Sequence, residues 1–302
     1  MTRMKLVFNT LTVLIICLAC STMAQAQATR TWVSGVGDDA NPCSRTAPCK
    51  TFAGAISKTA AGGEISVLDP GGFGAVTITK AITIDGEGTL AGLLNATVNG
   101  IIINAGANDV VHIRNVLING TSGANIGLNG IRYLAGKSVV VENCMISGFS
   151  QRGIDVTLGA ATGKLSVINT TITTGFEGIG LQSAGAGSHI AIFNSRILNT
   201  TNAAINTLVG AVTISDSMVA DNTSFGIIAQ GNSSIMVERT VIAHNATGIS
   251  TTGSATIRLS NATINGNTNG ITISGGTVAT FQNNSIAAGQ GAGVPNSMLM
   301  QQ

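Results

Sequence analysis

The sequence is poor in aromatic and charged residues. Only 3% of its 302 residues are aromatic and 9% are charged, whereas 44% are hydrophobic and 39 residues are glycine. The hydrophobic content excludes a disordered chain, and the scarcity of charge excludes the charged surface of an ordinary globular domain. Since Val, Ile and Thr dominate the apolar positions, we expect an all-β fold whose surface consists of Ser, Thr, Asn and Gly.

The chain also lacks an apolar run long enough to cross a membrane. The run at residues 11–19 follows Arg3 and Lys5 and precedes a small-residue cleavage site that ends at Ala26. It falls short of the roughly 20 residues that a spanning helix needs. Residues 1–26 are therefore predicted to be a signal peptide removed after Ala26, and we expect a secreted, periplasmic or extracellular protein without a membrane span.

No cluster of positive charge is present. Lys and Arg occur singly along the chain, and removal of Arg3 and Lys5 with the leader leaves acidic and basic residues in balance. A nucleic-acid partner requires clustered cations that neutralise phosphates. We therefore expect no such partner.

Cysteine is scarce as well. Cys43 and Cys49 flank a short loop bounded by prolines, and in an exported protein this spacing favours a disulfide over a metal site without His partners. Cys144 is expected to be a small buried hydrophobic residue. The residues before Cys20 lack the usual leucine of a lipoprotein site, so a lipid anchor is not expected.

What the sequence does contain is a repeat. After residue 110, two alternating apolar residues are followed by Asn and then by another apolar residue, and the interval between copies shortens to about 22 residues. A period in this range indicates stacked units that share one core. Alternation directs Val139 and Val141 inward, and Val140 and Glu142 outward. The copies are VHIRNVLI, VVVENCMI, LSVINTTI, IAIFNSRI, VTISDSMV, IMVERTVI, IRLSNATI and ATFQNNSI.

Each repeat predicts three short strands. A second strand follows the Asn, and a third follows a Gly or Ala, as at Ile131 and Ile205. Three strands per repeat make a coil and not a hairpin. With earlier copies near residues 82–84 and 100–101, roughly nine or ten turns should stack at ~4.8 Å, which gives a rod on the order of 45 Å long.

A column of polar residues marks one bend of the coil. Asn tolerates a left-handed backbone and carries both a donor and an acceptor, so stacked copies are expected to satisfy the buried backbone groups of the bend and one another. Asp216 and Arg239 interrupt the column in adjacent turns, where we expect them to pair or to face solvent. The predicted ladder consists of Asn115, Asn143, Asn169, Asn194, Asp216, Arg239, Asn261 and Asn283.

These repeats resemble a single-stranded right-handed parallel β-helix of the pectate-lyase-like superfamily, with three short parallel sheets and an asparagine ladder. The segment WVSGVGDDANPCSRTAPCKTFAGAI is similar to the start of many secreted members. On this resemblance, residues 27–63 form a first strand, a disulfide loop and a capping helix that Thr51 begins. Residues 64–288 form the β-helix, and residues 289–302 form a C-terminal cap or tail.

The resemblance also suggests where a reaction could occur. Polysaccharide lyases and glycoside hydrolases of the superfamily react on the outer face of one sheet, which matches the strands that follow Gly. The catalytic candidates are Arg132 and Asp155 on that face and Glu177 in a flanking turn beside Arg152. A lyase would also need calcium. A hydrolase needs two or three converging carboxylates, which we do not find, so a cross-turn Arg132–Asp155 ion pair is the favoured interpretation.

Other polar residues point to no cofactor. Asp38, Asp39 and Asn41 could hold calcium, but Asx hydrogen bonds in a turn explain them more simply. The lone tryptophan, Trp32, is expected to be buried beneath the cap and not to be a sugar platform. The histidines fall in different columns, so we predict no metal site. They are His112, His189 and His244.

The favoured function is therefore an exported, non-catalytic rod that binds polysaccharide or serves as a structural protein at a cell surface. This hypothesis rests on shape and on the resemblance. Two alternatives stay open: a lyase or glycoside hydrolase that uses Arg132, Asp155 and Glu177, and an adhesin.

Overall fold

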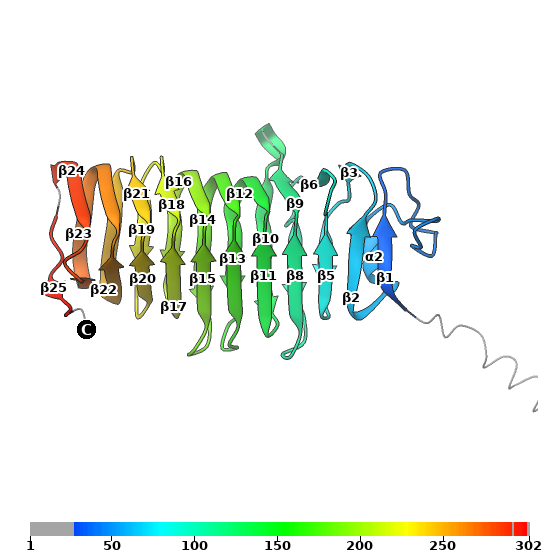
Figure 1. Cartoon of the computed structure of the whole chain (residues 1–302), viewed down its shortest axis with the longest axis horizontal. Helices are drawn as coiled ribbons and strands as arrows, with labels where there is room; N and C mark the ends of the chain where they lie inside the picture. The colour runs from blue at the N-terminus through cyan, green and yellow to red at the C-terminus, as the bar shows by residue number, and fades with distance from the viewer. Residues whose placement is uncertain (1–26, 122, 292, 301–302) are drawn as a thin grey trace, which may run out of the picture.

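The computed structural model describes residues 27–121, 123–291 and 293–300 (Figure 1). Paired strands within these ranges run parallel and coil through about ten turns, which confirms the predicted all-β solenoid. No helix in the described ranges is long and apolar enough to cross a membrane. The predicted signal peptide, residues 1–26, lies outside the described residues.

Three parallel sheets run along the rod. The first sheet contains β1 (Ala28–Val33), β2 (Thr59–Val67), β5 (Ile82–Asp85), β8 (Val110–Arg114), β11 (Ser138–Glu142), β13 (Lys164–Ile168), β15 (His189–Phe193), β17 (Ala211–Ser215), β20 (Ser234–Glu238) and β25 (Ser297–Met298). The last parts of β22 (Thr247–Ser260) and β23 (Thr263–Thr280) complete it.

The longer strands bend from the second sheet into the third. The second sheet contains β3 (Gly71–Gly72), β6 (Ala91–Asn95), β9 (Val116–Gly120), β18 (Met218–Ala220), β21 (Val241–Ala243), β24 (Ser285–Gly291) and the first parts of β12 (Met145–Thr157), β14 (Thr171–Ser183), β16 (Arg196–Thr207) and β23. The third contains β4 (Val76–Ile78), β7 (Ile101–Asn104), β10 (Gly127–Ala135), β19 (Phe225–Ala229), and parts of β12, β14, β16, β22 and β23.

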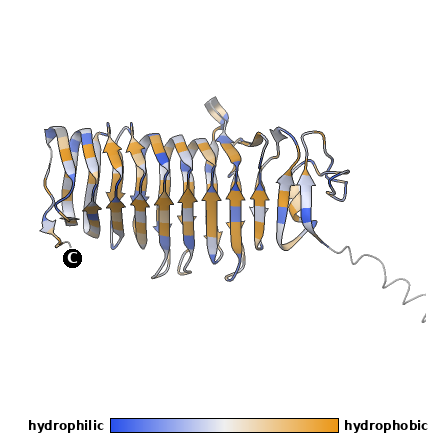
Figure 2. Cartoon of the chain, viewed as in Figure 1, coloured by the Kyte–Doolittle hydropathy of each residue, from blue (hydrophilic) through white to orange (hydrophobic). Residues whose placement is uncertain are grey.

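Alternation of side chains builds the core. Val139 and Val141 are fully buried, whereas Val140 and Glu142 lie partly exposed on the outer face, as predicted. Equivalent Val, Ile and Leu residues of successive turns stack into one hydrophobic column, and Figure 2 shows hydrophobic residues in the strands all along the rod. Each turn therefore depends on its neighbours for burial.

The single-turn helix α2 (Phe52–Ile56) packs against β1, β2 and β4 near the N-terminal end of the rod. Thr51 caps it, since its hydroxyl accepts a hydrogen bond of 2.9 Å from the N–H of Gly54. Phe52 and Ala55 are buried, and the Phe52 ring lies 5.2 Å from that of Phe73. A 3₁₀ turn, η1 (Gly123–Asn125), protrudes between β9 and β10. Strands β2 and β24 extend across the expected boundaries at residues 63 and 288.

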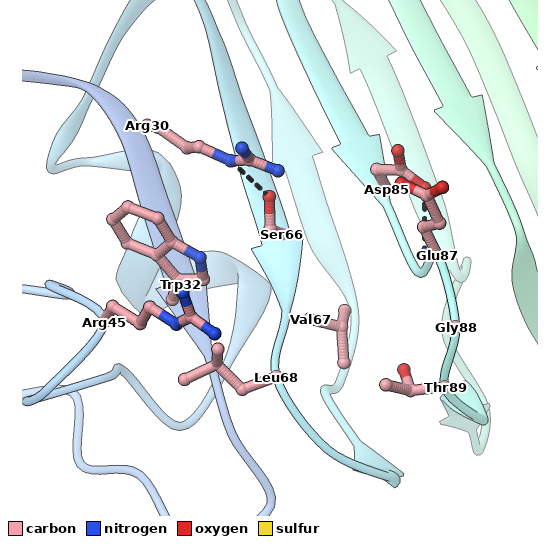
Figure 3. Close-up of a pocket in the computed structure, with 10 residues that line it drawn as sticks. All are labelled: Arg30, Trp32, Arg45, Ser66, Val67, Leu68, Asp85, Glu87, Gly88 and Thr89. Atoms are coloured by element: carbon pink, nitrogen blue, oxygen red, sulfur yellow. Dashed lines mark hydrogen bonds between the residues drawn. The ribbon is translucent and has the colours of Figure 1, made fainter.

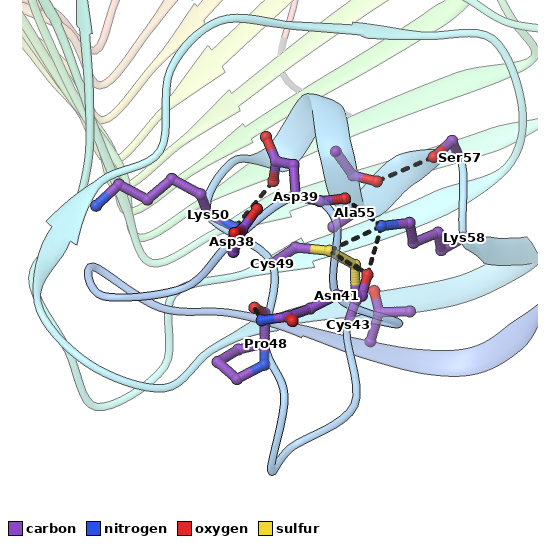
Figure 4. The surroundings of a disulfide bond; sticks show 12 residues. Asp38, Asp39, Asn41, Cys43, Pro48, Cys49, Lys50, Ala55, Ser57 and Lys58 are labelled. Carbon is purple, nitrogen blue, oxygen red and sulfur yellow. Dashed lines mark hydrogen bonds between the residues drawn. A yellow bond between two sulfur atoms is a disulfide. The ribbon is translucent and has the colours of Figure 1, made fainter.

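The loop before α2 carries a disulfide between Cys43 and Cys49, both fully buried (Figure 4). The Lys58 ammonium donates hydrogen bonds to the carbonyl oxygens of Asp39 and Asn41, which hold the same loop against α2. The loop is therefore fixed at both ends, with residues 44–48 at its tip.

The predicted ladder residues lie at the bend between the first and second sheets. Their amides bond across turns on the outer side, at 3.3 Å from Asn143 to Asn115 and 2.6 Å from Asn169 to Asn143. In the last turn Gln282, with φ 65°, occupies the left-handed position one residue before Asn283. In the earlier turns that position, with φ between 42° and 59°, belongs to Asn115, Asn143, Asn169, Asn194, Asp216, Arg239 and Asn261.

At four turns, a backbone N–H of this bend donates to the side chain that follows the ladder residue of the next turn, which differs from our expectation. The N–H of Thr170 donates to the Ser195 hydroxyl at 3.2 Å, and the N–H of Ser195 donates to the Ser217 hydroxyl at 3.1 Å. The left-handed residue turns its own side chain outward, so Asn143 and Asn169 are exposed and the next side chain points inward.

A buried asparagine ladder occurs instead at the bend between the second and third sheets. Asn222, Asn245 and Asn267 are at most 3% exposed. The side-chain oxygen of Asn245, Oδ1, accepts hydrogen bonds from the backbone and side-chain N–H groups of Asn222, at 3.1 and 2.8 Å. Asn245 donates to Asn267 in the same way, at 2.9 and 2.8 Å. This ladder was not predicted from the sequence.

Candidate functional site

Polar side chains gather on the outer face of the third sheet. In adjacent strands, Arg132, Asp155, Gly180 and Asn206 occupy one outward column. Arg152 and Glu177 are paired in the strands just before that column. We define the charged face as Arg132, Arg152, Asp155, Glu177, Asn202 and Asn206.

Glu177 lies at the centre of the charged face. It is 2% exposed, and three donors converge on its carboxylate. Asn202 and Asn206 each donate to Oε1 at 2.8 Å, and Arg152 Nε donates to Oε2 at 2.6 Å. Both carboxylate oxygens are therefore hydrogen-bonded within the protein.

Asp155 is held in a similar way. It is 3% exposed, its Oδ1 accepts from Arg152 Nη1 at 3.2 Å, and its Oδ2 accepts from the Thr157 hydroxyl at 3.1 Å. Arg152 thus bridges Asp155 and Glu177 and neutralises them jointly. A charge buried without such partners would be strongly destabilising.

Gly180 provides the space in which Arg152 lies. A Cβ atom at Gly180 would sit 2.4 Å from Arg152 Nε and 2.5 Å from its Cδ. The Arg152 side chain therefore crosses the sheet directly over Gly180, which has no side chain to obstruct it.

Arg132 is the most accessible charge of the face. Its side chain is 41% exposed, compared with 22% for Arg152. Its Nε lies 3.3 Å from Asp155 Oδ2, close enough for an ion pair but poorly aligned for a hydrogen bond. The predicted Arg132–Asp155 pair is thus close in space, and it leaves the guanidinium with donor capacity toward solvent.

The arrangement is suited to binding and poorly suited to proton transfer. A general base must be free to accept a proton from a substrate, and a general acid must hold one. Both carboxylates instead accept hydrogen bonds from arginine and from amide or hydroxyl groups. The group that the charged face presents to solvent is the Arg132 guanidinium, and the buried carboxylates lie beneath it.

The sequence pointed to Arg132, Asp155 and Glu177, but it did not reveal the roles of the amides around them. Asn129 is 1% exposed, and its side-chain oxygen accepts a hydrogen bond of 3.1 Å from the backbone N–H of Arg152. Asn202 and Asn206 bind Glu177, as described above. Alternation places Asn206 in the outward column, whereas the register shift between Gly175 and Glu177 conceals the position of Asn202.

The other candidate ligands do not form a metal centre. No group of three or more His, Cys, Asp or Glu side chains suited to a metal occurs within residues 27–300 as described. His244 lies beside Asp221, at 3.4 Å, and His112 is exposed on the first sheet. Burial, followed by the neighbouring charge of Lys164, lowers the pKa of His189 below its usual value.

Asp39 serves the loop instead of a cation. Its Oδ1 accepts from the N–H groups of Lys50 and Thr51, at 2.8 and 2.9 Å, and its Oδ2 accepts from the Thr51 hydroxyl at 2.7 Å. Burial raises the pKa of Asp39, but the bonds from Thr51 and Lys50 and the charge of Lys58 outweigh it, so the pKa lies below its usual value.

Trp32 and Cys144 occupy contrasting environments. The expected burial of Trp32 beneath the cap is wrong: Thr31 and Val33 point inward, and Trp32 lies half-exposed on the outer face of β1. Cys144 is buried, as expected, and this burial raises the pKa of its thiol to about 11.

Solved structures share this fold. Pectate lyase Pel9A superposes with a TM-score of 0.60 at 15% identity, over 85% of this chain and 76% of that one. The A-module of mannuronan C-5 epimerase AlgE4 from Azotobacter vinelandii gives 0.53 at 14% identity, over 90% and 89%. No curated protein matches the sequence. At these identities the likeness concerns the fold.

A family profile agrees with the structure. The profile described as "Right handed beta helix region" matches residues 129–286, just over half of the chain, from the charged face to the penultimate strand. Together with the parallel coil and its three sheets, this match confirms the resemblance found in the sequence. The chain belongs to the right-handed β-helix family.

Proposed function

We propose that the protein is an exported, non-catalytic rod that binds acidic polysaccharide along the charged face. One observation carries this proposal: Arg132 is 41% exposed and retains free donors, while the carboxylates beneath it are bonded within the protein. A guanidinium is a good partner for the carboxylate of a uronic acid. Regularly spaced strands also suit a polymer that repeats.

The absence of a free carboxylate on the face supports binding without turnover. Hydrolysis of a glycosidic bond requires one carboxyl group that donates a proton and a second that attacks or activates water. Asp155 and Glu177 are each engaged by Arg152. Their other oxygens accept hydrogen bonds from Thr157, Asn202 and Asn206, so a substrate would have to displace a donor from the protein to reach any carboxylate oxygen.

The first experiment tests binding and turnover together. Purified protein is incubated with calcium and with polygalacturonate, alginate or neutral dextran, and ultraviolet absorbance and new reducing ends are followed. We expect no product, together with retardation of the protein in gels that contain an acidic polymer. Product release that is lost in Asp155→Ala would contradict the proposal and favour the lyase or hydrolase alternative.

A pair of arginine variants then locates the binding surface. Arg132→Gln removes the exposed guanidinium and should weaken acidic-polymer binding about tenfold, as expected for one charge-assisted contact. Arg258→Gln is the matched control, because Arg258 is exposed on the first sheet and bonds only to Ser234 among the described residues. Equal losses in both variants would disprove a localised face. Cell attachment without polymer binding would favour the adhesin alternative.

A further inference from the structure

A second polar hollow lies at the N-terminal end of the rod, away from the charged face. Its volume is about 410 Å³, large enough for a sugar residue. The residues around it come from β1, β2, the disulfide loop and the turn after β5 (Figure 3). Its main polar residues are Arg30, Trp32, Arg45, Asp85, Glu87 and Thr89.

One wall of the hollow supplies hydrogen-bond donors. Trp32 directs the nitrogen-bearing edge of its indole toward the hollow, and the Arg45 guanidinium lies beside it (Figure 3). Arg45 is exposed and forms no ion pair with any residue that the structure describes. The loop that carries Arg45 is closed by the Cys43–Cys49 disulfide. The donor group is thus presented on a constrained segment.

Arg30 is already bonded within the protein and supports the Trp32 ring. Its guanidinium stands 5.7 Å from the centre of the Trp32 ring, pairs with Glu64 at 2.8 Å and donates from Nε to the Ser66 hydroxyl at 2.9 Å. This stack fixes Trp32 on one side. Arg45 remains the cation available to a ligand.

The opposite wall supplies acceptors. Glu87 is exposed and has no ion pair among the described residues, and Thr89 lies beside it. Asp85, by contrast, is 4% exposed and bound to Arg114 at 2.8 Å. Glu87 and Thr89 can therefore receive hydroxyl groups while Arg45 and the indole N–H bind a carboxylate.

We infer that this hollow binds a sugar that carries a carboxylate, as a site separate from the charged face. A guanidinium and an indole N–H on one wall recognise the carboxylate, and the carboxylate and hydroxyl of the other wall recognise ring hydroxyls. The inference goes beyond the proposed function, because the hollow lies on the first sheet and the charged face on the third.

Fluorescence of Trp32 provides a direct test, since the chain contains one tryptophan. Galacturonate and glucuronate should change its emission saturably. Galactose, which lacks the carboxylate, and acetate, which lacks the ring, should bind at least tenfold more weakly. Glycine tests a zwitterionic ligand. No saturable change with either sugar acid, or an equal response to acetate or glycine, would overturn the inference.

Three variants separate this site from the charged face. Arg45→Gln should weaken the fluorescence response at least tenfold, whereas Arg196→Gln, an exposed arginine on the second sheet, should leave it unchanged. Arg132→Gln should also leave it unchanged, although it weakens polymer binding. An unaltered fluorescence response in Arg45→Gln would refute the sugar-acid site in the hollow without affecting the proposed function. If the protein does not bind acidic polymer but its fluorescence still responds to sugar acids, the proposed function fails and the site in the hollow stands.

Discussion

Glu177 illustrates how burial changes the meaning of an acidic residue. In the sequence it is a candidate catalytic group, yet in the structure it organises Arg152, Asn202 and Asn206 at 2.6 to 2.8 Å. A catalytic carboxylate is often held at a cost to stability, so that its removal is neutral or stabilising. A buried carboxylate that holds a partly exposed arginine and two amides has the opposite effect, because its removal leaves their donors without an acceptor.

Replacement of Glu177 by Ala should therefore lower the free energy of unfolding by about 2 to 3 kcal/mol, because Asn202 and Asn206 lose a buried acceptor and Arg152 loses its closest partner. Urea unfolding followed by circular dichroism would measure this. Glu142→Ala is the matched control, since Glu142 lies partly exposed on the first sheet and should change stability by less than about 0.5 kcal/mol. A neutral or stabilising Glu177→Ala would argue for a functional carboxylate.

Residue-level prediction from sequence succeeded where strict alternation holds. Arg132 and Asp155 lie in one outward column because β10 and β12 pair without interruption from Ile131 to Tyr133. It failed for Trp32, because the cap was expected to cover a strand whose alternation in fact turns that side chain outward. Alternation within β1 was a better guide than the size of the aromatic ring.

At the level of elements, the bends distinguish two kinds of polar column. The predicted column at the first bend is mostly exposed, whereas Asn222, Asn245 and Asn267 at the second bend are buried and bond to backbone and side chain alike. Sequence periodicity predicts that polar residues recur at a bend. It does not predict which of two successive residues turns inward, because that depends on the left-handed residue between the strands.

Asn245→Ala should lower the free energy of unfolding by about 3 kcal/mol, since two donors of Asn222 would remain buried without an acceptor. Thermal and urea unfolding would report the loss. Asn169→Gly is the control: glycine keeps the left-handed backbone of φ 47°, and the change removes an exposed side chain with its hydrogen bonds to neighbouring turns. A comparable loss in both variants would show that exposed and buried columns contribute alike.

At the level of the whole molecule, repetition makes complete turns exchangeable. Ser234 and Thr256 hold equivalent positions in the first sheet, and Asn222 and Asn267 bracket the same turn at the second bend. Deletion of residues 234–255 would bring Asn222 against Asn267 and Asp216 against Asn261. The fold was predictable at this scale because each turn repeats the same inward pattern.

The deletion of residues 234–255 should give a folded rod shorter by about 4.8 Å, with cooperative unfolding retained. Small-angle scattering and circular dichroism would test it. Deletion of residues 236–256 is the control, because it joins the inward residues Ile235 and Ile257 directly and reverses the faces of the following strand. If both deletion proteins fold equally well, the inward and outward alternation of the strands is not what the solenoid requires.

The orientation of the hydrogen bonds has a mechanical consequence. Strands run across the rod, so the bonds that join successive turns lie along its axis. Tension between the two ends would load these bonds one ladder at a time, as in peeling, and would not shear many ladders together. Each detached turn would release about 22 residues, roughly 70 Å of extended chain. Under tension, the molecule would lengthen in small, regular steps at low force.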